Sequence, residues 1–393
     1  MDRPKLRNVE RIGLVRDGVD HLVLRDPMSI AQTIAIDAEF GPVLDALDGT
    51  RTLAQIRQSL LMNRGLDVAL DDLRAFAADL EAAGLLDGDA FRSRWLACHD
   101  AFFAAPTRVP MLAGTLYSEH AQELRDALSA ALGPISPSGR ATRALLMPHG
   151  PLEITGPVVA ATLPALPPRD QIDAVVLLGA DHHPALLPFA VLDKPYETPL
   201  GVLPCAAQLV DALTRRIPWL DREAIRHRVA HSLEWTALYL QHAWGADVPP
   251  CVPIVCGAAA IVNQRAAHEG VAELVAALDG LLEDERVLVV VAAELAHAGE
   301  AYGRAPLDAD GLAAIEARDR AVLDAVIRGR PRDVLARAQD PLEQGRPSGL
   351  PALLVLAELV TGLHGEACAY ALTPVAGGSA GWAGLAGAAF RSP

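Results

Sequence analysis

The sequence has few cysteines and no long hydrophobic run. Its five cysteines are an odd number, lie far apart and include no CxxC pair, so we expect neither a disulfide framework nor a structural zinc knuckle. No stretch of 18 or more consecutive apolar residues occurs, although 51% of the residues are hydrophobic, and this argues against a membrane span. GxGxxG and P-loop patterns are also missing, so no nucleotide-binding motif is expected.

Positive charge is in the minority. The chain has 34 Lys and Arg against 49 Asp and Glu, which gives a formal net charge of −15. Such an acidic chain repels nucleic acid and anionic membrane surfaces, so we expect neither as a partner. The first residues, MDRPKLRNVERIG, lack the apolar core and the cleavage site of a secretory signal, and the expected location is therefore the cytoplasm.

The first 92 residues have a pattern of their own. Two strand-like pieces, RIGLVRDGV and HLVLRD, precede a helical stretch that breaks at Asp48-Gly49 and restarts after Thr52. A third amphipathic segment, LDDLRAFAADLEAAGLLDGD, follows. Because 393 residues exceed the usual size of one hydrophobic core, we predict a small winged-helix domain over residues 1–92 and a larger domain after it.

This N-terminal segment also carries a family resemblance. DGTRTLAQIRQSL followed by LRAFAADLEAAGLL resembles the PqqD-like domains, over roughly residues 8–90. The resemblance implies binding of a peptide or of a radical SAM partner by strand addition, whereas a purely structural appendage is the alternative. DNA binding is disfavoured because the presumed second helix offers only Arg57, and such contacts need a basic surface.

Residues 93–110 are predicted to form a linker, in which Pro106 and Pro110 should end regular structure. From residue 111 to 393, strand-like and helical segments alternate. The strand-like runs are RATRALLMPHG, DAVVLLGADHH, CVPIVCGAA and RVLVVVAAELAH. Continuous apolar runs of this kind are typical of strands buried on both faces. The alternation predicts an α/β domain with a mainly parallel sheet flanked by helices.

Histidines follow three of these four runs. His149 follows the first, His182 and His183 follow the second, and Glu294 and His297 follow the fourth. Ligands of open α/β sheets bind beyond the carboxyl ends of the strands, and imidazoles that converge there with a carboxylate form a metal or acid–base site. Each histidine taken alone could instead be a hydrogen-bonded core or surface residue. His183 is expected to be a neighbour of the site, because adjacent strand residues point to opposite sides.

Two further segments carry polar candidates. His227 and His231 have the i, i+4 spacing of a metal-chelating helix pair, but Arg228 replaces the glutamate of HExxH, so a zincin is not predicted. His231 could donate a proton or orient a substrate, while Ser232 or Glu234 could simply cap the helix. In the turn YETPLG, Thr198 could hydrogen-bond a substrate, although the turn itself is typical of a structural element.

The motifs occur in a recognisable order. PHG, LGADHH, YETPLG, HSLEW and AAELAHAG, preceded by AGTLY and followed by GRPSGLPALLVLAEL, resemble the Memo family, also called AmmeMemoRadiSam system protein B, over residues from about 110 to 390. The resemblance implies a fold similar to class III extradiol dioxygenases, which hold a non-haem iron with two histidines and a carboxylate.

The resemblance also implies roles for individual residues. It places metal ligands at His149 and His182, with Glu294 as the carboxylate, and acid–base groups at His231 and His297. Some family members have a cysteine ligand where this chain has Gln344, next to Glu343. A neutral amide is a poor ligand compared with a thiolate, so Glu294, Glu343 or water would have to complete the site.

We therefore predict a metal-binding Memo-like domain, with Fe(II) as the favoured ion and copper or zinc as alternatives. Such a domain would be a dioxygenase-like oxidoreductase that acts with a peptide or radical-enzyme partner. The alternative is a non-catalytic protein that binds a peptide or partner in the same pocket. The changes at Gln344 and Pro151 favour that alternative, because some family members have a cysteine ligand at the first position, and the family's PHAGY motif has become His149-Gly150-Pro151-Leu152 and lost its aromatic residue.

Overall fold

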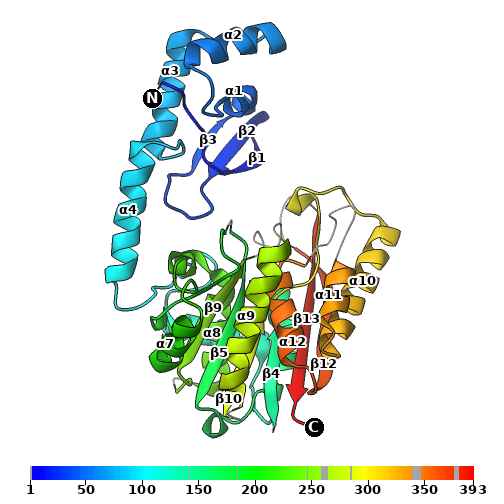
Figure 1. The fold of residues 1–393 in the computed structure, drawn as a ribbon. Coiled ribbons are helices and arrows are strands. Elements are labelled where there is room, and N and C mark those ends of the chain that lie inside the picture. Colours follow the sequence, from blue (N-terminus) through cyan, green and yellow to red (C-terminus); the bar gives the residue numbers. More distant parts are fainter. Residues whose placement is uncertain are drawn as a thin grey trace. The chain divides into compact units, whose positions relative to one another are not determined.

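The structure is a computed structural model. It describes residues 2–139, 141–183, 185–245, 247–257, 264–283, 286–338, 347–375 and 380–393, with the backbone alone for 264–268. The chain forms two compact units, Met1–Ala105 and Pro106–Pro393 (Figure 1). Among the described helices, none is long and apolar enough to cross a membrane.

The N-terminal unit is an antiparallel sheet followed by helices. Its strands pair in the order β1-β2-β3. Their bounds are Glu10–Arg16, Val19–Arg25 and Ile34–Asp37, and the helices are α1 Gly41–Ala46, α2 Leu53–Arg64, α3 Leu70–Ala83 and α4 Asp89–Ala104. Helix α2 begins at a capping box, in which Thr52 and Gln55 satisfy each other's backbone N–H. It ends at Gly65, which has a left-handed backbone with φ of 65°.

All three strands of this unit precede its helices. No hairpin follows the helices within the described residues of the unit, so the topology does not establish a winged helix. The winged-helix and PqqD-like assignments therefore stay predictions.

Residues 93–104, which the sequence analysis assigned to a linker, belong instead to helix α4. The segment DAFRSRWLACHDAFFA contains neither glycine nor proline. Rings at i, i+4 spacing also pack along it: Trp95 stacks on His99 at 4.9 Å, and His99 contacts Phe103 at 4.6 Å between centroids. The helix ends at Ala104, ahead of Pro106, because a proline disfavours the helical conformation of the residue before it.

The C-terminal unit is built on a mixed, largely parallel sheet. Its described strands pair in the order β11-β13-β4-β10-β5-β9-β6, and β12 pairs with the outside of β13. The four predicted strands are confirmed as β4 Thr142–Met147, β5 Ala174–Asp181, β9 Cys251–Gly257 and β10 Val287–Ala292. They are adjacent and parallel at the centre of the sheet, so their carboxyl ends meet at one edge.

Antiparallel strands flank this centre. They are β6 Phe189–Val191, β11 His297–Gly299, β12 His364–Pro374 and β13 Gly381–Arg391. The sequence did not predict β12 and β13. Alanine and glycine dominate β13 and lack the bulk typical of strands, and β12 mixes small, polar and charged residues. Close packing requires the glycine at Gly387 of β13, because a Cβ there would lie 1.8 Å from Oγ1 of Thr162.

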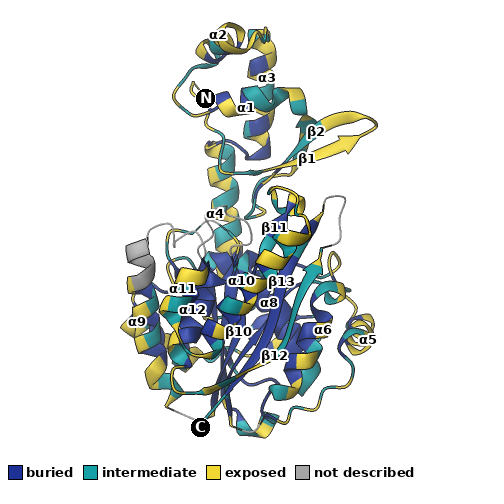
Figure 2. Cartoon of the chain, turned by 90° about the vertical axis from the view of Figure 1, so that its right-hand side faces the viewer, coloured by how far each residue is buried: buried dark blue, intermediate teal, exposed yellow. Residues whose placement is uncertain are grey.

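Helices cover both faces of the sheet (Figure 2). They are α5 Ala121–Leu132, α6 Leu152–Thr162, α7 Ala207–Arg216, α8 His231–Trp244, α9 Gln264–Leu282, α10 Ala309–Ile327, α11 Pro331–Ala338 and α12 Leu350–Leu359. A short hairpin, β7 Tyr196–Thr198 with β8 Gly201–Leu203, lies outside the sheet. The largest apolar core packs α7, α9 and α12 against one face. Helices α6 and α8 contact the same central strands, and α8 begins at His231.

Candidate metal centre

The predicted site lies beyond the carboxyl ends of β4, β10 and β5. Met147 at the end of β4 is paired with Ala292 at the end of β10. His149 and Glu294 each come two residues later in their chain segments, so both emerge at the same level of the sheet. His182 directly follows β5, and His231 is the first residue of α8. The topology therefore brings together side chains that are far apart in the sequence.

Three imidazoles converge at this edge of the sheet. Nε2 of His149 lies 3.1 Å from Nε2 of His182, and the His182 and His231 rings stack with centroids 4.8 Å apart. One ring nitrogen from each histidine lies within 4.8 Å of the other two, an arrangement that could hold a metal ion. Two imidazole nitrogens on one tetrahedral zinc ion, with bonds of about 2.0–2.1 Å, would be about 3.3 Å apart. The observed separation is close to that value.

Glu294 and His297 form a second pair beside the three histidines. Oε2 of Glu294 lies 2.9 Å from Nε2 of His297, and the His297 ring packs edge-on against Tyr302 with centroids 4.7 Å apart. A Cβ on Gly150 would lie 3.8 Å from Oε1 of Glu294, so the carboxylate lies beside the turn that carries His149. Glu294 is thus bonded to His297 and adjoins the three-histidine cluster.

The surroundings keep the imidazoles neutral. Burial lowers the pKa of His149 below its usual value. Enclosure of the ring and the neighbouring His149 lower the pKa of His182 to about 3, although part of this side chain is exposed to solvent. Burial, together with His182 and His149, holds the pKa of His231 well below its usual value. Neutral imidazole is the form that binds metal ions.

Glu294 has the opposite charge state. Burial opposes its ionisation, but the nearby His149 and the hydrogen bond from His297 outweigh burial and lower its pKa to about 2. The site therefore combines three uncharged nitrogen donors with one ionised carboxylate. This set of groups suits a divalent transition-metal ion better than an anion.

The turn that carries His149 is fixed by buried hydrogen bonds. Gly150 has φ of 131°, a backbone conformation that favours glycine. Its carbonyl oxygen accepts from the Tyr239 hydroxyl at 2.8 Å and from Oγ1 of Thr155 at 3.1 Å. Tyr239 lies on α8, two turns beyond His231, so one helix supports both histidines. Tyr239 could not be predicted from the sequence, because its pattern is that of a core aromatic.

Helix α8 is seated directly on β5. Oγ of Ser232 donates a 2.7 Å hydrogen bond to the carbonyl oxygen of Ala180, and a Cβ on Gly179 would lie 2.5 Å from that same Oγ. Neither Ser232 nor Glu234 caps the helix, because no side-chain hydrogen bond closes its N-terminus. The close contact with β5 fixes the position of His231.

Glu234 is the centre of a buried network that the sequence analysis missed. Its carboxylate accepts hydrogen bonds from Arg108 and from the Tyr117 hydroxyl, and both pairs are buried. It also accepts from the backbone N–H of Met111 at 2.9 Å and of Leu112 at 2.8 Å. The network ties residues 108–117 to the first turn of α8. It explains why the AGTLY segment belongs with the site motifs although it contributes no ligand.

The other candidate residues have partners elsewhere. Nδ1 of His183 lies 2.8 Å from Oδ1 of Asp181, and Oδ2 of Asp181 accepts from Nε of Arg226 at 2.6 Å. The Thr198 hydroxyl lies 2.6 Å from Oε1 of Gln241. His183 thus lies next to the cluster without belonging to it. The Thr198 hydroxyl is occupied by a hydrogen bond to Gln241 of α8.

The i, i+4 partner of His231 faces away from it. Nδ1 of His227 lies 2.6 Å from the Tyr196 hydroxyl and Nε2 lies 2.8 Å from the carbonyl oxygen of Ala190. Both ring nitrogens are therefore engaged inside the protein. Glu343 and Gln344, the other possible ligands, lie outside the described residues.

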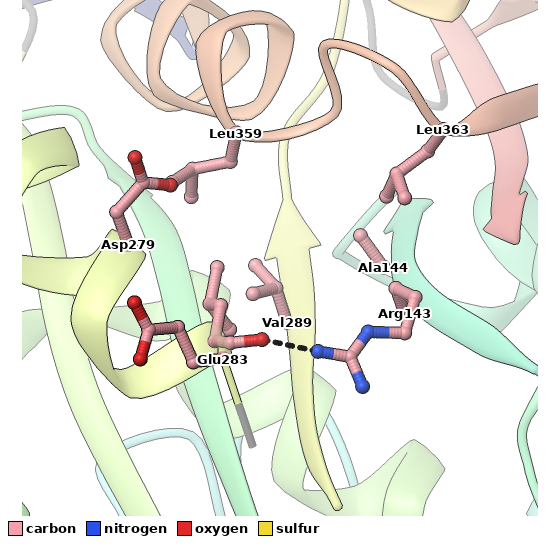
Figure 3. A pocket seen from close by; sticks show the side chains of 8 residues that line it. Arg143, Ala144, Asp279, Glu283, Val289, Leu359 and Leu363 are labelled. Atoms are coloured by element: carbon pink, nitrogen blue, oxygen red, sulfur yellow. Dashed lines mark hydrogen bonds between the residues drawn. The ribbon is translucent and has the colours of Figure 1, made fainter. Parts of the chain in front are cut away.

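A surface cavity of about 330 Å³ lies at the opposite end of the sheet (Figure 3). It is lined by Arg143 and Ala144 at the start of β4, by Val289 of β10 and by Asp279 and Glu283 at the end of α9. Arg143 donates a hydrogen bond to the carbonyl oxygen of Leu282. The cavity opens at the amino ends of the strands, and none of the histidines lines it.

Comparison with known proteins agrees with this architecture. A MEMO1 family protein of Thermus thermophilus is 30% identical over 291 residues, which cover 73% of this chain and 83% of that protein. A MEMO1 family protein of Aquifex aeolicus is 25% identical over 286 residues, which cover 72% of this chain and 74% of that protein. A sequence model described as "Memo-like protein" matches residues 108–369, the part of the chain that contains the three histidines. The chain therefore belongs to the Memo family.

Proposed function

We propose that His149, His182 and His231 together bind a divalent transition-metal ion and that the C-terminal unit is a metal-dependent oxidoreductase. The observation that carries the proposal is the convergence of three imidazoles, of which His149 is buried, His231 half-buried and His182 exposed, with the Nε2 atoms of His149 and His182 3.1 Å apart. A hydrogen bond between two neutral rings explains one such contact, but it does not explain why a third ring stacks on the pair. A shared ion would explain all three.

The residues fit a metal in a further respect. Nδ1 of His149 is buried and has no hydrogen-bond partner among the described residues, so no acceptor for Nε2–H or Nδ1–H other than the neighbouring histidine ties up this ring, and its Nε2 is available to an ion. Imidazole suits zinc, copper and iron, whereas a site of two imidazoles and a carboxylate is typical of non-haem Fe(II). Because the Glu294 carboxylate adjoins the cluster, Fe(II) is the ion that we propose first, with copper and zinc as the alternatives.

The protein's own groups would divide the work. The three imidazoles would hold the ion, which would supply the chemistry of a site open to a substrate or dioxygen. Glu294 places negative charge beside the cluster and accepts a hydrogen bond from Nε2 of His297. His297 could hold or transfer a proton at that nitrogen as a general acid or base. This assignment gives His231 the role of a ligand, and Glu294 remains available as a further ligand.

The experiment that tests the proposal is a measurement of bound metal. The full chain is loaded anaerobically with Fe(II), freed of excess ion and analysed by mass spectrometry of its metals, next to His182→Ala and His231→Ala. His364→Ala is the matched control, because His364 is exposed on β12. We expect one equivalent of iron in the wild type and in the control, and a loss of at least tenfold in affinity in the two site variants.

Absence of bound metal would indicate a non-catalytic binding function. Background metal in all four proteins after loading with Fe(II), Cu(II) and Zn(II) would exclude a metal centre. The pocket would then be better explained as a non-catalytic site for a peptide or a partner, with the partly exposed His182 as its accessible group.

We further propose that the N-terminal unit binds a peptide, for example of a radical SAM partner, at the edge of β3. That strand is last in its sheet, so one of its edges can accept an added strand. Titration of the full chain with a candidate peptide, followed by NMR of the Ile34–Asp37 amides, tests this proposal. Unchanged amide signals at saturating peptide would exclude β3 as the binding strand.

A further inference from the structure

Strand β1 is an exposed edge strand with apolar side chains. It lies at the end of the sheet order β1-β2-β3, and within the described residues it pairs with β2 alone. Ile12 is 42% exposed and Leu14 is 47% exposed, β1 is exposed at every position from Arg11 to Arg16, and the turn end of the β1–β2 hairpin is exposed (Figure 2). Long, exposed, apolar edge strands are templates for pairing with another chain.

The hairpin turn determines which backbone groups of β1 face outward. Asp17 and Gly18 have φ of 53° and 79°, the signature of a two-residue type I′ turn. The pair that flanks such a turn, here Arg16 and Val19, exchanges its backbone hydrogen bonds, and hydrogen-bonded pairs then alternate along the hairpin. The N–H and C=O groups that point away from β2 therefore belong to Arg11, Gly13 and Val15.

The sequence of β1, ERIGLVR, is complementary to itself in the antiparallel direction. When two copies are paired about Gly13, Ile12 faces Leu14 of the second copy and Glu10 faces Arg16 of the second copy. These four side chains lie on one face of the strand, because residues two apart point the same way. Opposite charges and apolar pairs directly across from each other stabilise a sheet.

The residue at the centre of this pairing has room for it. A Cβ on Gly13 would meet no atom within 4 Å, and its outward N–H and C=O can bond those of the second copy. Glu10 already lies 2.6 Å from Arg25 and Arg16 lies 3.8 Å from Asp17, but both ion pairs are exposed. Exposed pairs of this kind are weak, so they do not prevent new pairing across the strands.

We propose that two copies of this chain associate through antiparallel pairing of their β1 strands, centred on Gly13. The interface is isologous, as two-fold symmetry requires. It joins two three-stranded sheets into one continuous sheet and covers the exposed edge of each.

Sedimentation of the full chain tests the proposal. We expect a species of twice the 41.5 kDa of the chain that dissociates on dilution. Glu10→Arg and Arg16→Glu each place like charges opposite each other at two symmetric positions, and each should raise the dissociation constant about tenfold. The double variant Glu10→Arg/Arg16→Glu restores opposite charges and should restore most of the affinity.

Ile12→Lys and Met62→Lys form a matched pair of variants. Both replace an exposed apolar residue of the same unit, at 42% and 76% exposure, but Met62 lies on α2, away from the sheet edge. We expect a monomer for Ile12→Lys and an unchanged dimer for Met62→Lys. Circular dichroism checks that each variant is folded. If Ile12→Lys does not fold, the charge-reversal variants test the interface instead.

A cross-link tests the register. Residues in a hydrogen-bonded antiparallel pair have Cα atoms about 5.5 Å apart, within the range that a disulfide spans. Gly13→Cys should therefore give a disulfide-linked dimer with oxidised glutathione, whereas Val15→Cys, four residues from its own symmetry mate in this register, should not. A wild-type monomer at all concentrations, or a dimer that Ile12→Lys leaves intact, would overturn the proposal. Binding of an extended peptide to a monomeric β1 would do the same.

Discussion

The carboxylate of Glu234 and the guanidinium of Arg108 form an ion pair in which both side chains are fully buried. Glu234 lies one turn after His231 on α8, so the pair connects the candidate metal centre to residues 108–117. A buried charge that loses its partner is left uncompensated, at a cost of about 3–5 kcal/mol. We predict that Arg108→Met lowers the free energy of unfolding by this amount, measured by urea denaturation.

The control for that prediction is an exposed pair of the same chemistry. Arg215 and Asp211 form an exposed i, i+4 ion pair on α7, and exposed pairs contribute about 0.3–0.5 kcal/mol. Arg215→Met should therefore have almost no effect on the free energy of unfolding. Equal effects of the two substitutions would mean that the buried pair does not hold the first turn of α8 in place.

Gly179 should be essential for the position of His231. A Cβ at this residue would lie 2.5 Å from Oγ of Ser232 and 2.7 Å from the Leu233 side chain, so Gly179→Ala must displace the first turn of α8. Misplaced ligands typically weaken metal affinity by about 10–100-fold. We predict a loss in this range, measured by competition with a chelator of known affinity.

Gly156→Ala is the matched substitution, because a Cβ there would meet its nearest atoms at an ordinary 3.6 Å. It should leave metal affinity unchanged. If Gly179→Ala binds metal as tightly as Gly156→Ala, the contact between α8 and β5 does not determine the ligand geometry.

His227 should make the metal-free protein sensitive to acid. Burial lowers the pKa of His227 to about 3 from an ordinary value of 6.5, so between these pH values the unfolded chain binds a proton that the folded chain excludes. The folded state therefore loses stability as the pH falls below 6.5, by about 1.4 kcal/mol per pH unit for one such group. The loss stops near pH 3, where the folded state also takes up the proton.

Urea denaturation of the metal-free chain at a series of pH values measures this dependence. His227→Gln cannot take up the proton and should reduce the slope of stability against pH between 6 and 4 by about that amount. An unchanged slope would mean that His227 does not exclude the proton. His364→Gln, at an exposed position, should leave the slope unchanged.

Much of the fold could be predicted because its signals are local. The four central strands are continuous apolar runs, and His149 and His182 follow these runs within one or two residues, so hydrophobic pattern and strand direction are sufficient to find both. Strand β13 was missed because packing against close neighbours such as Thr162 requires glycine at positions such as Gly387. Such contacts leave no periodic pattern.

The arrangement inside the site depends on contacts that no local pattern encodes. Spacing along the chain shows that His231 opens a helix, but only the docking of α8 on β5 places its ring against those of His149 and His182. The same limit applies to Arg108, whose partner Glu234 lies 126 residues away. The sequence therefore identifies which side chains lie at the carboxyl edge of the sheet, but it does not determine which of them would be ligands.

The central claim is that three histidines hold one metal ion, and the most direct measurement is an anomalous difference map from crystals loaded with Fe(II). We predict a single peak at about 2.0–2.2 Å from one ring nitrogen each of His149, His182 and His231. A peak that is bonded to Glu294 but not to His231, or no peak among these side chains, would contradict the claim.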